Sequence, residues 1–194
     1  MSEAAHAALA APSAWIVRWS HLVAPAATVL DVACGSGRHM RWFQQRGHAA
    51  TGVDRSAEAL AAAAAWGQVV PADIEAGLWP FADQRFGAVV VTNYLWRPRL
   101  PDIVAAVAPG GVLLYETFAA GNETVGKPSR PDFLLQPGEL LAACAGLRVV
   151  AYEDGFLDAP PRFVQRIAAV RLSGPAERPP PRHPLEAGAG PADQ

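Results

Sequence analysis

The segment over residues 28–41, with the sequence TVLDVACGSGRHMR, constrains the fold of this chain more than any other. Its first part, residues 29–33, predicts a short buried strand, and a helix is expected to begin near Arg38. The turn between them carries Gly35 and Gly37. A strand, a glycine turn and a helix in this order bring backbone N–H groups and a helix N-terminus close to a ligand.

Strand-like and helix-like segments alternate after this unit. Short apolar runs predict strands, and runs with apolar residues at helical spacing predict helices. The predicted strands cover residues 29–33, 48–53, 68–72, 86–92, 112–117, 147–153 and 163–172, and the predicted helices cover residues 37–46, 56–66, 101–108 and 137–145, with a turn over residues 109–111. A further helix, capped by Ser13, precedes the first strand. The alternation predicts an α/β fold with a doubly wound, mainly parallel sheet.

Length and composition indicate one folded domain. The chain has 194 residues, of which 51% are hydrophobic, so it can bury a full core. The folded domain is expected over residues 12–172. Residues 1–11 are rich in alanine and predict a flexible N-terminus, while the proline, glycine and alanine of residues 173–194 predict a disordered tail.

Charge and cysteine content argue against several classes of function. The formal net charge is −2, which gives no electrostatic surface for nucleic acid or for an anionic membrane. The two cysteines, Cys34 and Cys144, lack the spacing of metal ligands or of a disulfide framework, so no metal site is predicted. The sequence shows no signal peptide and no membrane-spanning run, and a reducing cytoplasm is the expected location.

Acidic residues at the ends of three successive predicted strands indicate the site. Open α/β sheets bind ligands at the carboxyl ends of their strands. Asp31 precedes the glycines of the first turn, where a carboxylate repels a pyrophosphate but suits the ammonium group of an amino-acid-like cofactor. Asp54 follows the second strand and can accept from both hydroxyls of a ribose. After the third strand, Asp73 can accept from an exocyclic adenine amine while Ile74 packs on the ring.

A dinucleotide fingerprint, G-x-G-x-x-G, is the main alternative for the glycine turn. Met40 stands at the position of its third glycine, so the close helix–strand packing which that glycine permits is missing. Each acid on its own could equally be a turn or cap residue. Three acids at consecutive strand ends beside a glycine turn favour an amino-acid-like cofactor over a dinucleotide.

The segment over residues 28–41 and these acids resemble motif I and the following strand ends of the class I S-adenosylmethionine (AdoMet) methyltransferases. The resemblance covers residues 12–172 and implies a Rossmann-like methyltransferase sheet of seven strands, whose last strand is antiparallel. Ala33 and Arg38 stand where the family often has glycine, and alanine is tolerated there if its φ stays negative. The resemblance implies AdoMet as the cofactor, bound by Asp31, Ala33, Gly35, Gly37, Asp54, Arg55, Asp73, Ile74 and Asn93.

The chain is also similar in places to a small bacterial subgroup, the tellurite-resistance methyltransferases. The run TNYLWRPRLPDI over residues 92–103 and the later QPGELL carry this similarity. The Gly-Glu-Leu-His segment of that subgroup is absent from this chain, so the similarity does not extend to an oxyanion substrate.

Candidate catalytic residues follow the fourth and fifth predicted strands. Tyr94 could form a wall of the acceptor pocket, and Arg97 or Arg99 could bind an anionic acceptor. The alternative for both arginines is a solvated surface position. Glu116 could act as a general base or as a pairing residue, and the sequence identifies no base. The long loop over residues 116–133, and residues 121–130 within it, is a candidate lid.

These expectations converge on methyl transfer from AdoMet to a small molecule, giving S-adenosylhomocysteine (AdoHcy). The chain has no basic run and no separate recognition domain, which argues against nucleic acid as a partner. A protein methyltransferase and a non-catalytic AdoMet-binding or interaction module are the two alternatives. An NAD-dependent oxidoreductase is the fourth hypothesis. The sequence predicts no oligomeric state.

Overall fold

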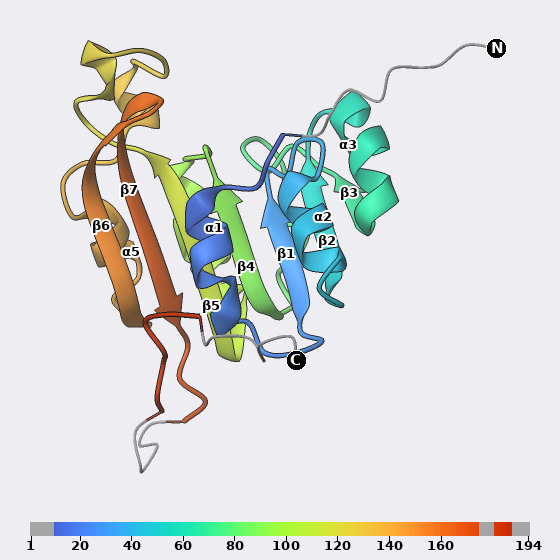
Figure 1. The fold of residues 1–194 in the computed structure, drawn as a ribbon. Coiled ribbons are helices and arrows are strands. Elements are labelled where there is room, and N and C mark those ends of the chain that lie inside the picture. Colours follow the sequence, from blue (N-terminus) through green and yellow to red (C-terminus); the bar gives the residue numbers. More distant parts are fainter. Residues whose placement is uncertain (1–9, 175–180, 188–194) are drawn as a thin grey trace, which may run out of the picture.

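The computed structural model describes residues 10–174 and 181–187. Within them, seven strands form one sheet in the order β3-β2-β1-β4-β5-β7-β6 (Figure 1). The pairs among β1 to β5 are parallel, and β7 runs antiparallel to β5 and to β6. The expected seven-stranded sheet with an antiparallel last strand is therefore confirmed. The strands are β1 (Thr28–Val32), β2 (Ala49–Asp54), β3 (Gln68–Pro71), β4 (Phe86–Thr92), β5 (Val107–Phe118), β6 (Arg148–Asp158) and β7 (Pro161–Val170).

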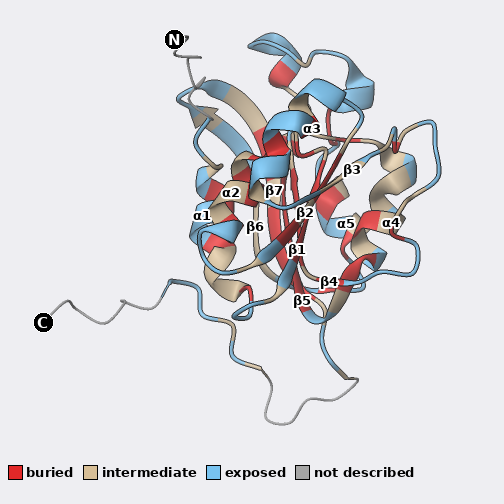
Figure 2. Cartoon of the chain, turned by 90° about the vertical axis from the view of Figure 1, so that its right-hand side faces the viewer, coloured by how far each residue is buried: buried red, intermediate tan, exposed pale blue. Residues whose placement is uncertain are grey.

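Helices cover both faces of the sheet (Figure 2). On one face lie α1 (Ala14–Trp19) and α2 (Arg38–Gln44), and on the other lie α4 (Leu100–Ala105) and α5 (Glu139–Ala143). The remaining helix, α3 (Ala57–Ala63), contacts α2, β2 and β3. Short 3₁₀ turns complete the chain: η1 (Ser20–Leu22), η2 (Ala64–Trp66), η3 (Arg97–Arg99), η4 (Asn122–Thr124) and η5 (Pro131–Phe133).

Strand side chains alternate between two cores, one on each face of the sheet. Val29 of β1 packs with Trp15 and Trp19 of α1, whereas the next residue, Leu30, packs with Ile103 of α4 on the other face. Side chains two positions apart in a strand share a face. Asp31 therefore lies on the same face as Val29, under α1 and α2.

The start of β5 differs from the sequence prediction. Residues 106–108 were expected in a helix and residues 109–111 in a turn, but α4 ends at Ala105 and β5 begins at Val107. Val107 pairs with Phe86 of β4, and the N–H of Gly110 donates to the carbonyl oxygen of Arg171 at 2.7 Å. Partners far along the chain supply these hydrogen bonds, so the local proline and glycine signals were misleading.

Strand β6 is longer than predicted. It continues past the expected end at Glu153 to Asp158, because β6 and β7 form one antiparallel hairpin that pairs as far as Asp158 and Pro161. Glycine and acidic residues normally indicate a turn. Here the acidic side chain of Glu153 is neutralised by Arg18 and Arg166, so the strand can continue through it.

The two chain ends fall partly outside the described residues. Residues 1–9 of the expected flexible N-terminus are not described, and neither are residues 175–180 and 188–194 of the expected tail. Within the described tail, the carbonyl oxygen of Pro184 lies 3.0 Å from Nε2 of His21. This contact differs from the expectation of a tail that does not pack. No helix in the two described ranges is long and apolar enough to cross a membrane.

Candidate active site

The turn after β1 has an unusual backbone at three positions. Ala33, Gly35 and Gly37 all have positive φ, at +53°, +53° and +80°. The condition under which alanine would be tolerated at this position, a negative φ, is therefore not met by Ala33. Hydrogen bonds hold the turn in this shape, since the N–H of Cys34 donates to the carbonyl oxygen of Val53 at 3.0 Å, and strain of this kind persists only where the surroundings impose it.

The two glycines of the turn have different physical roles. A Cβ built on Gly35 meets no heavy atom within 4 Å, whereas a Cβ on Gly37 would lie 3.0 Å from Cβ of Ala63 in α3. Gly37 is thus needed for the packing of α2 against α3. Gly35 leaves space, and this is the space in which a ligand can approach the backbone.

Asp31 is buried beneath this turn without a full set of partners. The residue is 1% exposed, and within the described part of the chain its Oδ2 has no hydrogen-bond partner. Burial raises the pKa of Asp31 to about 7, against the lowering effect of the nearby Arg38 guanidinium. A buried acceptor with no donor is costly, so this oxygen has an unused capacity to accept a hydrogen bond.

His39 is the residue that approaches this orphan oxygen. Its Nδ1 lies 3.9 Å from Oδ2 of Asp31, and its Nε2 accepts from the N–H of Ser13 at 3.1 Å. Burial lowers the pKa of His39 to about 3, so the ring is neutral and the contact with Asp31 is not an ion pair. His39 therefore links Ser13, which precedes α1, to Asp31 beneath the turn.

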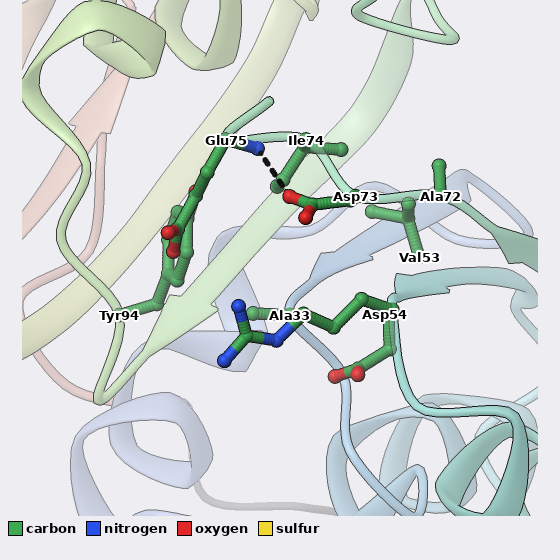
Figure 3. A pocket seen from close by; sticks show the side chains of 9 residues that line it. Ala33, Val53, Asp54, Ala72, Asp73, Ile74, Glu75 and Tyr94 are labelled. Atoms are coloured by element: carbon green, nitrogen blue, oxygen red, sulfur yellow. Dashed lines mark hydrogen bonds between the residues drawn. The ribbon is translucent and has the colours of Figure 1, made fainter. Parts of the chain in front are cut away.

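A cavity of about 130 Å³ lies beside the turn (Figure 3). The ends of β1, β2, β3 and β4 all contribute to it. Asp54 and Asp73 come from two of these ends, and the ring of Tyr94 borders the cavity on another side. The lining comprises Ala33, Val53, Asp54, Arg55, Ala72, Asp73, Ile74, Glu75 and Tyr94.

Asp54 and Asp73 both organise the backbone around the cavity. Oδ2 of Asp54 accepts from the N–H of Gly35 at 2.9 Å, which links β2 to the turn after β1. Oδ1 of Asp73 accepts from the N–H groups of Glu75 and Ala76 at 2.9 and 3.2 Å. These backbone hydrogen bonds lower the pKa of Asp73, so it presents a charged carboxylate at the rim. Each carboxylate retains lone pairs for a ligand.

The structure brings most of the predicted cofactor residues together and adds others. Tyr94 was expected at the acceptor, but it lines this cavity, and its hydroxyl has no partner within the described residues. Glu75, Val53 and Ala72 also line the cavity and were not singled out from the sequence. Each directly adjoins a predicted residue, and this adjacency is the signal that could have found them.

Asn93 follows β4 at the edge of this region. It has a positive φ of 54°, and its N–H donates to the carbonyl oxygen of Glu116 at 3.0 Å. Asparagine tolerates this backbone conformation better than most residues. Asn93 does not line the cavity itself.

The guanidinium groups of Arg97 and Arg99 are occupied by other parts of the chain. Arg97 donates to both carboxylate oxygens of Glu139, at 2.6 and 2.9 Å, and this pairing raises its pKa. Arg99 donates to the carbonyl oxygens of Ile74 and Gly77 and to Asp102. These contacts hold the loop before α5 and the turn after β3.

Glu116 lies within β5 on the face covered by α1. It is 2% exposed and accepts from Ser13 Oγ at 3.0 Å and from Arg166 Nη1 at 3.2 Å. Nη2 of Arg162 lies 3.6 Å from its Oε1. A carboxylate engaged by a hydroxyl and two guanidinium groups is a pairing residue, which was one of the two roles expected for it.

A family model described as a methyltransferase domain matches residues 29–111 of the chain. The chain is 38% identical over 104 residues to the malonyl-[acyl-carrier protein] O-methyltransferase of Enterobacter lignolyticus, covering 50% of this chain and 41% of that protein. It is 30% identical over 145 residues to the tRNA U34 carboxymethyltransferase of Klebsiella pneumoniae, covering 68% of this chain and 43% of that protein. The chain thus spans less than half the length of these relatives.

Solved structures show the same fold at lower sequence identity. TehB from Haemophilus influenzae superposes with a TM-score of 0.63 at 20% identity, over 78% of this chain and 59% of that chain. A SAM-dependent methyltransferase from Methanosarcina mazei superposes with a TM-score of 0.64 at 14% identity, over 84% of this chain and 99% of that chain. These likenesses concern the fold of the sheet and its helices.

Proposed function

We propose that this chain, whose residues 29–111 match the methyltransferase domain family and whose sheet has the class I methyltransferase fold, transfers the methyl group of AdoMet to a small-molecule acceptor. The observation that carries the proposal is the orphan oxygen of Asp31. It is a buried carboxyl oxygen with an unmet hydrogen bond, next to a turn that keeps space open at Gly35. The ammonium group of an amino-acid-like cofactor would satisfy both its charge and its hydrogen bond.

Arg38, which lies beside Asp31 and outside the cavity lining, and the residues that line the cavity fit the other parts of AdoMet. Arg38 is half-buried beside Asp31, and it would pair with the α-carboxylate of the cofactor as Asp31 pairs with the ammonium. Ile74 and Tyr94 would enclose the adenine ring. Asp54 would accept from the ribose hydroxyls through the lone pairs that the turn leaves unused. Asp73, at the rim, would accept from the adenine amine.

AdoMet, when bound, supplies an activated methyl group on a positively charged sulfur. The contribution of the chain is therefore to hold the cofactor, orient the acceptor and exclude water. Trp15 and Trp19 of α1 are 1% exposed, so α1 is anchored in the core on its face of the sheet. Ser13, which caps α1, donates through its N–H to Nε2 of His39 in α2 and so links the two helices beside Asp31.

The small-molecule acceptor is supported by the chain itself. The formal net charge of −2 does not favour tRNA, the substrate in the name of one relative. The other relative is named for a malonyl group on a carrier protein, which combines a small acyl acceptor with a protein. A protein-borne acyl group is accordingly the second candidate.

Calorimetric titration with AdoHcy tests the proposal. The wild type should bind AdoHcy, and Asp31→Asn should weaken binding by about tenfold or more, because an amide cannot neutralise an ammonium. Asp83→Asn removes an exposed carboxylate outside the site and is the matched control. Equal affinity in all three proteins would contradict the assignment of Asp31. Production of AdoHcy from AdoMet with a metabolite panel, with a malonyl carrier protein and with tRNA would then separate the acceptor classes.

A further inference from the structure

A group of ion pairs connects the ends of β5 and β7 with α1, and the mechanism above leaves it unused. This group, the β7 arginine cluster, consists of Arg18, Glu116, Glu153, Arg162 and Arg166. All of its side chains meet on the α1 face of the sheet, where Arg166 also lies over the ring of Trp15 at 4.9 Å.

Two arginines of the cluster are held very differently. Arg166 is fixed by Glu116 at 3.2 Å and by two contacts of 2.5 and 2.7 Å with Glu153. The only ion pair recorded for Arg162 within the described residues is the 3.6 Å approach to Glu116, beyond ordinary hydrogen-bond length. Its buried Nε has no hydrogen-bond partner in the described part of the chain. Arg162 is therefore a cation with unused donors.

The charge of the cluster is unbalanced. Three arginines face two glutamates in the ion pairs of the described residues, which leaves one positive charge uncompensated. Arg162 carries this excess, because Glu116 and Glu153 are both engaged by Arg166. The side chain of Arg162 is 24% exposed, so an anion from solution can reach its guanidinium.

Arg162 lies at the same edge of the sheet as the cofactor region, with β4 and β5 between β7 and β1. The β5–β7 pairing ends at Phe118 and Val164, and Arg162 follows at the carboxyl end of β5. Ser13 joins the two regions, since its Oγ donates to Glu116 and its N–H donates to His39, whose Nδ1 lies 3.9 Å from Oδ2 of Asp31. A ligand on Arg162 would thus lie on the same face and at the same end of the sheet as the amino-acid end of the cofactor.

We propose that Arg162 is a binding residue for a carboxylate on the methyl acceptor. The proposal rests on the proposed function, which it extends to the chemical class of the acceptor. A guanidinium presents a planar fork of donors that matches the two oxygens of a carboxylate. Arg97 and Arg99 offer no such fork because their donors are already used.

Titration of malonate into the protein saturated with AdoHcy tests this proposal. Malonate should bind, and its neutral counterpart malonamide should not. Arg162→Gln should weaken malonate binding by about tenfold or more while AdoHcy affinity stays unchanged. Arg162→Lys keeps the charge but loses the planar fork, so it should bind malonate with intermediate affinity. Arg148→Gln, an exposed arginine at the opposite end of β6, is the matched control and should behave as the wild type.

The outcomes separate the two proposals. If the wild type fails to bind AdoHcy, the proposed function itself is wrong. If it binds AdoHcy but not malonate, binds phosphate as tightly as malonate, or loses malonate equally in Arg148→Gln, the carboxylate site at Arg162 is overturned. Should Arg162→Gln fail to fold, the comparison of wild type, Arg162→Lys and Arg148→Gln decides, and equal malonate affinity in all three would overturn the proposal.

Discussion

Among single residues, Asp31 links cofactor binding to pH. Its pKa is raised to about 7 by burial, and only the charged form attracts an ammonium group. The dissociation constant for AdoHcy should therefore rise as pH falls below about 7, approaching a tenfold change per pH unit. Titration calorimetry between pH 5 and 8 measures this slope, and Asp31→Asn should abolish it. A slope that survives in Asp31→Asn would assign the titration to another group.

Asp31 also makes the stability of the ligand-free protein depend on pH. This stability should fall as pH rises, whereas AdoHcy affinity should increase. The folded-state pKa of Asp31 lies above the unfolded value, so the folded state holds its proton more tightly. This contribution to stability is complete below about pH 4 and is lost as pH rises through about 7. The free energy of unfolding of Asp31→Asn should lack this component when the two proteins are compared by denaturant titration across that range.

Gly35 and Gly37 form a natural pair for separating binding from folding. Alanine at either position is strained by the positive φ, which costs about 1 kcal/mol. Gly37→Ala should destabilise further, because its Cβ would lie 3.0 Å from Ala63. Gly35→Ala should instead lose AdoHcy affinity, because its Cβ projects into open space beside the turn. Thermal unfolding and calorimetry on both variants check the division, and a loss of affinity confined to Gly37→Ala would reverse it.

For single residues, the sequence predicts where a side chain lies in the fold better than it predicts the backbone conformation. Asp54, Asp73 and Ile74 lie around one cavity because the ends of parallel strands meet at one edge of the sheet. The positive φ of Ala33 could not be predicted, because hydrogen bonds from Cys34 and Gly35 to β2 impose it. Oδ2 of Asp31 lacks a hydrogen-bond partner among the described residues because the fold buries it, and the local sequence does not predict this burial.

Among the connecting elements, Arg97 and Arg99 hold two separate loops. Arg99→Gln should loosen the turn after β3, because Arg99 donates to the carbonyl oxygens of Ile74 and Gly77. AdoHcy affinity should then fall by about tenfold, equivalent to about 1.4 kcal/mol. Arg97→Gln should leave AdoHcy affinity unchanged and lower the free energy of unfolding by about 1 kcal/mol, because it loses its pairing with Glu139. A fall in affinity for both variants, or for neither, would contradict this division.

Elements defined by local signals were predicted well, and those defined by distant partners were not. The boundaries of β4 (Phe86–Thr92) agree with the prediction because a buried valine run marks them. The start of β5 depends on pairing with Phe86 and Arg171, and the end of β6 depends on its hairpin with β7. The loop expected to act as a lid is anchored through the buried Asn122, which donates to Pro128 at 2.9 Å. Its mobility stays a prediction.

For the whole molecule, the C-terminal segment is expected to add little to stability. The contact between His21 and Pro184 is exposed, so truncation after Gly174 should lower the melting temperature by less than about 4 °C, equivalent to about 1 kcal/mol. AdoHcy affinity should not change, because the cavity lining comes from residues 33–94. Differential scanning calorimetry of the truncated and full chains measures the difference. A larger fall would show that the segment is part of the folded domain.

The two edge strands of the sheet, β3 and β6, affect the tendency of the protein to self-associate. An exposed strand edge offers unpaired backbone groups to a neighbouring molecule and can template aggregation. β3 limits this risk by its length of 4 residues, whereas β6 has 11 residues and relies on a register shift between Val149 and Ala151 and on the acidic side chains of Asp154 and Asp158. Salt screens repulsion between such exposed charges. Self-association through β6 should therefore increase with ionic strength, and light scattering at low and high salt would reveal it.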